Sequence, residues 1–339
     1  MVPPPPQQSG GAPSSSTAPQ ASITEIPIPS SLGNAVSGIA LAPDTSVYVS
    51  LGNSNADIGA RYANGIFTAI PYFDAQVEGF PFGAVAAATS NAAFFAMQTF
   101  RSPQSATAAS GIQEYYSGKT DLVGGGTPFT TIPDVVADAS GNIWYGISGD
   151  YTPIAVKQSA TVPPGSEYAY VHLPGDYTVN VLAVAAGPDG DGWFALSDGH
   201  IDRLSPAGAL LHEYATPPGT LVNGMAVATD NTLWFTDSGH NAIGKLAGTT
   251  FSSYPIPSAA SGVARITRGG DGAMWFTERS ANKIGRIAAG GSIVEYAVPT
   301  ANAGPAGIAG PNGGACSPSI IWFVEVNAGK IGEITIKGV

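Results

Sequence analysis

The sequence of 339 residues contains little charge and almost no cysteine. Only 11% of its residues are Asp, Glu, Lys or Arg, against about 25% in an average soluble protein. Lysine and arginine together number 13 and never form a run longer than two, which excludes the clustered positive field that nucleic acids and anionic membrane surfaces require. The single cysteine, Cys316, excludes an intramolecular disulfide framework and a cysteine-based zinc cluster.

Long apolar runs and short catalytic motifs are also missing. No stretch approaches the roughly 18–20 apolar residues of a membrane-spanning helix, so we expect no transmembrane segment. The sequence has no P-loop, dinucleotide fingerprint, Ser-His-Asp order or His-x-x-x-His spacing. The sequence therefore offers no candidate nucleophile with a neighbouring general base.

Glycine and proline, in contrast, are abundant: 44 and 28 residues, together about a fifth of the chain. Hydrophobic residues make up 44%, which is enough for a sizeable core. So many turn-forming residues disfavour a helical protein, and their scatter excludes a collagen-like one. The composition therefore predicts an all-β protein with many short strands and tight turns.

The N-terminal segment differs in composition from the rest. Residues 1–22 carry no charge and are rich in Pro, Ser, Gly and Gln. This predicts a flexible linker over 1–22, followed by one domain over 23–339. Linkers of this kind often follow a removed signal or lipid-anchor segment, so we expect a secreted, periplasmic or cell-envelope location.

The domain is built from internal repeats. Three C-terminal units align almost without gaps on a Trp-Phe-Thr/Val-Asp/Glu segment that is followed by Ile-Gly-Lys/Arg/Glu-Ile/Leu. Weaker copies upstream bring the number of units to seven, at intervals of 41–50 residues. The first aromatic residues of the seven units are Tyr48, Phe94, Trp144, Trp193, Trp234, Trp275 and Trp322.

Each unit is predicted to form four short antiparallel strands, and seven such units indicate a seven-bladed β-propeller. Residues 23–29 resemble the fourth strand of the sixth unit at 294–299, although they precede the first full unit, and the last unit ends at its third strand. We therefore expect the N-terminal strand to join the last blade and close the ring.

The repeat of Trp-Phe-Thr-Glu/Asp, Asn-x-Ile-Gly-Lys/Arg and Glu-Tyr-x-x-Pro resembles that of the virginiamycin B lyase (streptogramin lyase) family. The resemblance covers 23–339 and is closest in the last three units. It implies a seven-bladed propeller whose enzyme members open a cyclic depsipeptide by eliminative C–O cleavage, using Mg²⁺ and a histidine base on one face of the ring. Propellers of the NHL and regucalcin types stay open as alternatives.

The resemblance places the family's functional histidines in a Pro-His-Gly/Ala-Ile motif at the start of the first strand. None of the matching positions is a histidine here; they hold Ser37, Phe82, Asp134, Leu182, Asn223, Ser261 and Ala306. We expect the ligand-binding face to carry three of these residues together with the acidic residues that end the second strand: Asn223, Ser261, Ala306, Asp237, Glu278 and Glu325.

Asp237, Glu278 and Glu325 end the second strand in three consecutive units. Three carboxylates from neighbouring blades could converge on a hard cation, so they are a predicted site for Mg²⁺ or Ca²⁺. The alternative is that each carboxylate pairs with a nearby Lys, Arg or backbone N–H and stabilises the repeat.

His240 is the candidate replacement base, since it follows Asp237 on the same predicted face; the alternative is a solvated loop residue. Four tyrosines in the longer loops of the first three units are predicted to form a binding rim or, alternatively, to pack within those loops: Tyr62, Tyr115, Tyr116 and Tyr151.

Three functions follow from these patterns. The first is an exported, non-catalytic binding module that takes a small molecule, peptide or protein on one propeller face. The second is a Mg²⁺-dependent C–O lyase with a shifted base. The third is a subunit of an extracellular or envelope assembly that docks through the Pro-rich N-terminal tail. No nucleic-acid partner is expected.

Overall fold

The structure, a computed structural model, describes residues 19–33, 35–52, 57–71, 78–80, 84–89, 92–102, 105–116, 119–128, 131–148, 154–158, 168–174, 178–311 and 320–337. Three residues singled out in the sequence, Phe82, Tyr151 and Cys316, lie outside these ranges, as does most of the predicted linker.

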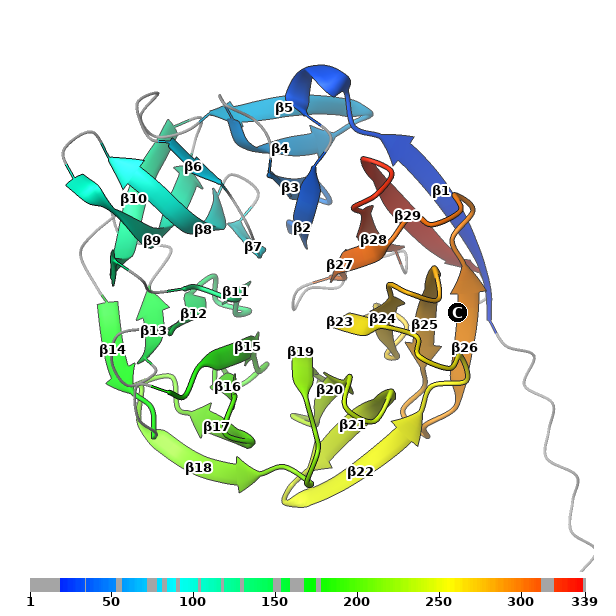
Figure 1. Cartoon of the computed structure of the whole chain (residues 1–339). Helices are drawn as coiled ribbons and strands as arrows, with labels where there is room; N and C mark the ends of the chain where they lie inside the picture. The colour runs from blue at the N-terminus through cyan, green and yellow to red at the C-terminus, as the bar shows by residue number, and fades with distance from the viewer. Residues whose placement is uncertain are drawn as a thin grey trace, which may run out of the picture.

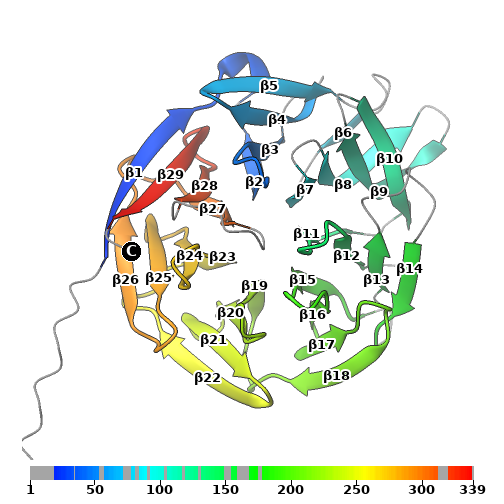
Figure 2. The same cartoon turned by 180° about the vertical axis from the view of Figure 1, so that it is seen from behind.

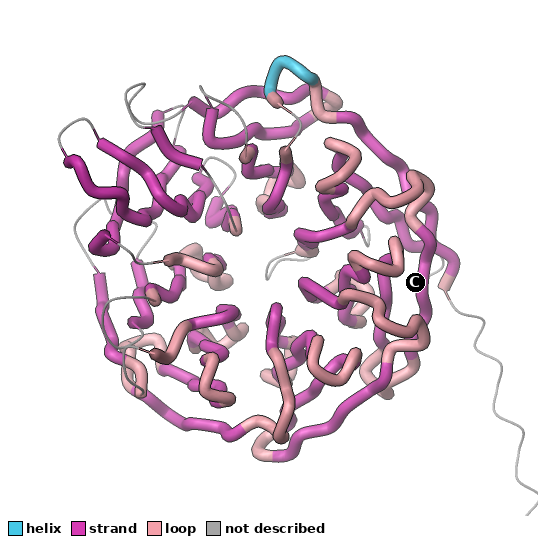
Figure 3. The backbone as a smooth tube through the Cα atoms, in the orientation of Figure 1, coloured by secondary structure: helices cyan, strands magenta, loops and turns pink. Residues whose placement is uncertain are grey.

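The described strands form seven antiparallel sheets, six of four strands and one of five. The sheets stand around a central axis, each with one inner strand nearest the axis, β2, β7, β11, β15, β19, β23 and β27 (Figure 1, and Figure 2 from behind). We number the sheets 1 to 7 in the chain order of their inner strands. Short turns connect the strands, and within the described ranges the 3-10 turn η1 (Ser30–Leu32) is the single helical element (Figure 3).

The six four-stranded sheets, each given from its inner to its outer strand, are sheet 1 with β2 (Val36–Leu41), β3 (Val47–Leu51), β4 (Asp57–Ala63) and β5 (Ile66–Pro71); sheet 3 with β11 (Val135–Ala137), β12 (Ile143–Ile147), β13 (Ile154–Gln158) and β14 (Tyr168–His172); sheet 4 with β15 (Val181–Ala186), β16 (Gly192–Leu196), β17 (His200–Leu204) and β18 (Leu210–Ala215); sheet 5 with β19 (Val222–Val227), β20 (Leu233–Asp237), β21 (Ala242–Ala247) and β22 (Thr250–Pro255); sheet 6 with β23 (Val263–Arg268), β24 (Met274–Glu278), β25 (Lys283–Ile287) and β26 (Ile293–Ala297); and sheet 7 with β27 (Pro305–Ala309), β28 (Ile320–Glu325), β29 (Lys330–Lys337) and β1 (Gln20–Pro27).

The predicted all-β propeller of four-stranded antiparallel blades is confirmed by this arrangement. Sheet 2 differs, because it has five strands and its third and fourth are long: β6 (Glu78–Phe80), β7 (Val85–Thr89), β8 (Ala92–Ser102), β9 (Ser105–Tyr116) and β10 (Lys119–Pro128). Its unit lacks the Asn-x-Ile-Gly segment that ends the loop between the second and third strands in sheets 5 and 6. As predicted, no helix in the described ranges has the length and hydropathy needed to span a membrane.

The N-terminal strand β1 pairs antiparallel with β29 and occupies the fourth-strand place in sheet 7. The register runs from Gln20 opposite Lys337 to Pro27 opposite Lys330. The sheet thus begins at Gln20, inside the segment predicted as linker over 1–22, because the pairing extends to the end of β29. In both views β1 lies at the rim beside β29 (Figures 1 and 2).

A shared side-chain network shows that β1 is equivalent to β26, the outer strand of sheet 6. In sheet 6, Glu295 accepts hydrogen bonds from Lys283 Nζ at 2.6 Å and from the backbone N–H of Ser258 at 2.8 Å. In sheet 7, Glu25 of β1 accepts from Lys330 Nζ at 2.8 Å, and its other oxygen accepts from the backbone N–H of the residue equivalent to Ser258, Thr300, at 2.7 Å. Each network ties a sheet to the connection that enters it.

A close contact between phenylalanine and glycine recurs in sheets 5, 6 and 7. A phenylalanine of the second strand pairs with a glycine of the third, and a methyl group on that glycine would overlap the phenylalanine ring. The pairs are Phe235 with Gly244, Phe276 with Gly285, and Phe323 with Gly332. The glycine of the Ile-Gly-Lys/Arg/Glu segment is therefore required by packing.

The tryptophan that precedes each phenylalanine takes part in a second recurring stack. In sheet 6, Trp275 stacks on Tyr296 at 5.5 Å between ring centroids, and the Arg286 guanidinium lies 5.9 Å from the Trp275 ring. Sheets 4 and 5 repeat this arrangement with Trp193, Tyr214 and Arg203, and with Trp234, Tyr254 and Lys245. The cation of the third strand thus covers an aromatic pair from the second and fourth strands.

We expect Gly285→Ala to destabilise the protein by about 1–3 kcal/mol, because the added methyl group forces the Phe276 ring out of its place. Gly290→Ala is the matched control, since a methyl group there meets open space. Urea unfolding followed by tryptophan fluorescence measures both. Equal stability of the two variants would contradict the packing role of Gly285.

Candidate functional site

A cavity of about 260 Å³ lies on the central axis and is lined by the inner strands of all seven sheets. Five of these strands contain a register shift near their start. Such bulges add a residue and re-aim the side chains beside them. The start of each inner strand is therefore a position at which side chains can reach the axis.

One position of the repeat is occupied by small residues in most sheets and lines the cavity in every sheet except sheet 4. It directly precedes the apolar inner-strand residue that pairs with the second strand, for example Met225, which pairs with Phe235. We call it the axial position. Five of its seven residues are glycine or alanine, namely Gly38, Ala84, Ala183, Gly224 and Gly307, and the other two are Asp134 and Arg265.

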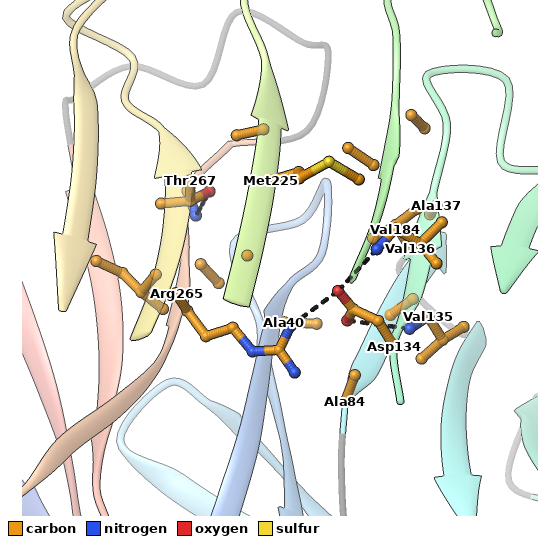
Figure 4. A pocket seen from close by; sticks show the side chains of 18 of the residues that line it. Ala40, Ala84, Asp134, Val135, Val136, Ala137, Val184, Met225, Arg265 and Thr267 are labelled. Atoms are coloured by element: carbon orange, nitrogen blue, oxygen red, sulfur yellow. Dashed lines mark hydrogen bonds and ion pairs between the residues drawn. The ribbon is translucent and has the colours of Figure 1, made fainter. Parts of the chain in front are cut away.

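Asp134 of sheet 3 and Arg265 of sheet 6 form an ion pair across the cavity (Figure 4). Arg265 Nη1 lies 2.9 Å from Asp134 Oδ2, and the guanidinium also donates to the backbone oxygens of Asn223 at 3.1 Å and Pro133 at 3.3 Å. Small residues at the other axial positions leave room for the long arginine side chain. The pair therefore links two sheets that are three apart in the chain.

The Asp134 carboxylate is held on all sides by donors. Besides Arg265, the backbone N–H of Val184 donates to Oδ2 at 3.2 Å and that of Val135 donates to Oδ1 at 3.1 Å. Burial raises the pKa of Asp134 above its ordinary value, and the Arg265 charge and these N–H groups offset part of the rise. The ion pair is thus needed to keep the buried carboxylate charged.

The register corrects two of the positions predicted to match the family's histidines. In sheet 6 the residue equivalent to Asn223 and Ala306 is Ala264, not Ser261. The prediction missed this because it matched Gly262 to Gly224; counted back from the aromatic residues Trp275 and Trp234, Ala264 is the residue equivalent to Asn223. In sheet 3 the equivalent residue is Pro133, one before Asp134, and in sheets 1 and 4 it is Ser37 and Leu182, as the sequence alignment had placed them.

None of the four histidines of the chain occupies such a position. His172 lies in β14, His200 in β17 and His212 in β18, and His240 lies in the turn between β20 and β21. The inner strands thus supply no imidazole to the axis.

The residues at the predicted histidine positions serve contacts between sheets. Asn223 donates from Nδ2 to the backbone oxygen of Val263 at 3.2 Å. The backbone oxygen of Ala306 accepts from Thr277 Oγ1 at 2.8 Å, and Thr236 Oγ1 donates to that of Ala264 at 2.9 Å. The threonine of the Trp-Phe-Thr segment therefore ties each sheet to the next.

Ser261 is fully buried in the loop before β23. Its backbone N–H and its hydroxyl both donate to Asn241 Oδ1, at 2.9 and 2.8 Å. This places Ser261 in a structural contact between sheets 5 and 6 and away from the axial cavity, whose lining does not include it.

Asp237 lies at the end of β20, directly before the turn that carries His240. Its Oδ1 accepts the backbone N–H groups of Leu221 and Gly239, each at 3.1 Å, and its Oδ2 lies 2.7 Å from His240 Nδ1. The alternative role in stabilising the repeat therefore applies to Asp237. The carboxylate also orients the imidazole, whose side chain is 46% exposed, so the pair has the geometry to accept a proton.

Glu278 and Glu325 are fully buried, and neither carboxyl oxygen of either residue has a hydrogen-bond partner in the structure. Burial, with Glu295 nearby, raises the pKa of Glu278 to about 8, and burial, with Glu25 nearby, raises that of Glu325 to about 7. Protonated carboxyl groups of this kind are poor ligands for a cation.

The predicted metal site does not fit these residues. Within the described ranges, no three His, Cys, Asp or Glu side chains gather closely enough to hold a metal ion. Asp237 is occupied by backbone donors and His240, whereas Glu278 and Glu325 are each buried beside their own lysine–glutamate pair. The structure thus does not bring the three carboxylates together.

The tyrosines with described side chains pack against other aromatic rings. Tyr62 lies 4.7 Å from Phe67 and 5.8 Å from Trp322 between ring centroids, and Tyr115 lies 6.3 Å from Tyr48. Both tyrosines thus pack rather than form a free binding rim, but they lie in strands β4 and β9 and not in the loops where they were predicted. Nothing is described of the Tyr116 side chain, and Tyr151 lies outside the described ranges.

Two site residues escaped the sequence prediction. Arg265 and the cavity-lining Arg268 were not singled out, and Asp134 was matched to the wrong place in the repeat. The signal was present: an alignment anchored on the aromatic pair puts Asp134 and Arg265 at the one position where the other units have glycine or alanine.

We expect Arg265→Met to destabilise the protein by about 2–3 kcal/mol, because it leaves the Asp134 carboxylate buried without its counter-charge. The double variant Asp134→Asn with Arg265→Met should recover part of this loss. Urea unfolding of the two single variants and the double variant gives the coupling energy. Strict additivity would contradict the ion pair across the cavity.

The pKa of Glu278 makes folding depend on pH. The folded protein keeps this proton up to about pH 8, whereas the unfolded chain releases it near 4.5, so its contribution to stability falls as the pH rises between these values. We expect Glu278→Gln to flatten the decline of the thermal midpoint from pH 5 to pH 8 and to unfold a few degrees higher at pH 8.

Asp230→Asn is the control for this measurement, because Asp230 is exposed and its pKa is lowered by hydrogen bonds from Thr232. It should leave the decline between pH 5 and pH 8 unchanged. The same decline in Glu278→Gln and in the unchanged protein would show that Glu278 is ionised in the fold.

Comparison with known proteins supports the family suggested by the repeat. A curated virginiamycin B lyase from Nocardia farcinica (strain IFM 10152) is 28% identical over 207 residues, which are 60% of this chain and 66% of that protein. The match thus spans slightly less than two thirds of the relative's length.

Solved structures share the fold. Virginiamycin B lyase from Staphylococcus aureus superposes with a TM-score of 0.74 at 20% identity, covering 93% of this chain and 99% of that one. A catalytically inactive histidine-to-alanine variant of the Staphylococcus aureus enzyme with quinupristin gives 0.72 at 21% identity, with the same coverage. The sequence model of the virginiamycin B lyase family matches residues 150–339, more than half of this chain, which therefore belongs to that family.

Proposed function

We propose that this chain is a non-catalytic member of the virginiamycin B lyase family that binds a ligand or partner on one face of the propeller. One observation carries the proposal: none of the chain's four histidines lies in an inner strand, where the resemblance places the family's catalytic histidines. A histidine-to-alanine variant of the Staphylococcus aureus relative is catalytically inactive, which supports the same conclusion.

We also infer that the seven sheets are seven blades of one closed ring. The pairing of β1 with β29 supports closure, because it gives sheet 7 its outer strand. The equivalent networks around Glu25 and Glu295 support it further. Closure of this kind leaves no frayed strand edge at the junction of the termini.

Export is part of the proposal and rests on composition. The uncharged, Pro-rich residues 1–22 and the near absence of cysteine fit a secreted, periplasmic or envelope protein whose targeting segment has been removed. Docking of this tail on another subunit belongs to the same proposal.

A lyase with a shifted base is the second candidate, and the pairing of His240 with Asp237 favours it. The carboxylate holds the imidazole in one orientation, as a general base requires. The pair lies at the end of sheet 5 where β19 begins, since Asp237 pairs with Val222.

Mass spectrometry with quinupristin and Mg²⁺ separates the two candidates. We expect no linear isomer of unchanged mass, with Staphylococcus aureus virginiamycin B lyase as the positive control. A chelator-sensitive linear product would overturn the proposal. Loss of that product in His240→Ala would then identify His240 as the base.

A further inference from the structure

Arg268 is a cation of the axial cavity that lacks a carboxylate partner. It ends β23, its residue is only partly exposed, and it belongs to the cavity lining. Its guanidinium donates to the backbone oxygen of Pro311 at 3.5 Å, a long contact, and forms no ion pair within the described ranges. Burial alone lowers the pKa of Arg268, with no neighbouring acid to oppose it.

The other partly buried arginines behave differently. Each pairs with an aspartate at 2.7–2.9 Å: Arg61 with Asp44, Arg203 with Asp189 and Asp191, Arg265 with Asp134, and Arg286 with Asp271. The chain has 24 acidic residues against 13 basic ones, so counter-charges are plentiful. An arginine left without one inside a cavity is therefore a candidate receptor for an external anion.

The remaining charges of the cavity are already satisfied. Arg265 and Asp134 neutralise each other. Asp138 turns its carboxylate to its own turn, where Oδ1 accepts the backbone N–H groups of Ser140 and Asn142, each at 2.9 Å. Arg268 is thus the charge in the described lining that has nothing to offset it.

The rest of the lining is mostly small and apolar. It includes Ala40, Ala86, Val136, Ala185, Met225 and Ile308. The hydroxyl of Thr267 already accepts the backbone N–H of Gly310 at 3.0 Å. Backbone groups of the inner strands add polar atoms to the lining, so the cavity offers apolar side chains and hydrogen-bonding groups side by side and suits an amphipathic ligand.

The length of the site follows from β23. Arg265 and Arg268 are three residues apart, which is about 10 Å at the rise of a strand. Along the backbone of β23, Arg265 with its ion pair to Asp134 stands at one end of this distance and Arg268 at the other (Figure 4 shows the ion pair).

We propose that the axial cavity binds a small amphipathic monocarboxylate, with its carboxylate on Arg268 and its apolar chain along the inner strands toward the ion pair of Asp134 and Arg265. A carboxylate there gains charge-assisted hydrogen bonds from a guanidinium that is already partly desolvated. This site is additional to the proposed binding of a ligand or partner on one face of the propeller. The proposal does not depend on whether His240 and Asp237 support lyase activity.

Isothermal titration calorimetry with octanoate tests the proposal on the full chain. Octanoate binds the unchanged protein, whereas octanol and octylamine bind at least about tenfold more weakly, because the first has no charge and the second has the wrong one. Arg268→Gln weakens octanoate about tenfold or more, and Arg268→Lys, which keeps the positive charge, retains part of the affinity.

Arg279→Gln is the matched control, because Arg279 is an exposed arginine of the same sheet that does not line the cavity. It leaves octanoate binding unchanged. Circular dichroism of each variant checks that it is folded. If Arg268→Gln does not fold, the comparison of Arg268→Lys with the unchanged protein still tests the proposal.

Three outcomes would overturn the proposal. Equal binding of octanol would show an apolar cavity without an anion site. Inorganic phosphate binding as tightly as octanoate would remove the role of the apolar chain. Unchanged octanoate affinity in Arg268→Gln would place the ligand elsewhere. A positive lyase assay changes none of these three binding measurements. The proposed non-catalytic function and the proposed carboxylate site can therefore be disproved independently.

Discussion

The contact between a phenylalanine of the second strand and a glycine of the third is the constraint on which the packing of sheets 5, 6 and 7 depends. It fixes the ring of Phe276 over Gly285, and the equivalent rings in the neighbouring sheets likewise. Because side chains alternate along a strand, the preceding tryptophan faces the other way and stacks on a tyrosine beneath a cation. Sheets 1 to 4 have another residue in the glycine's place. In sheet 4 it is Asp202, which is fully buried with neither oxygen hydrogen-bonded and whose pKa is raised by burial to about 7.

With the blades fixed in this way, differences in chemistry gather at the axis. Small residues at the axial position keep the inner strands close, and two units replace them with charged residues that meet across the cavity. The family scaffold is thus retained, and the residues at the positions predicted to match its histidines serve packing between sheets. The proposed binding of a monocarboxylate uses Arg268, which among the described lining residues is the cation without a counter-charge.

Much of the fold could be predicted from the sequence, because the residues that define the repeat make their contacts locally. The aromatic pair and the glycine of the third strand each act within one sheet, so the units could be recognised one by one. The site was harder to predict. Ser261 was assigned to a position that Ala264 occupies, because the glycine that follows Ser261 was matched to Gly224 instead of Arg265. The ion pair of Asp134 and Arg265 joins residues 131 apart in the sequence, and only the closing of sheets around the axis makes them neighbours.

The claim that the binding chemistry of this chain lies at the axis is tested most directly by a crystal structure of the full chain grown with octanoate. We predict density for a carboxylate against the Arg268 guanidinium, with the ion pair of Asp134 and Arg265 intact beside the apolar chain. Density at the His240 and Asp237 pair with none in the cavity would contradict this claim. So would an Arg268 side chain that pairs with a carboxylate of the protein itself.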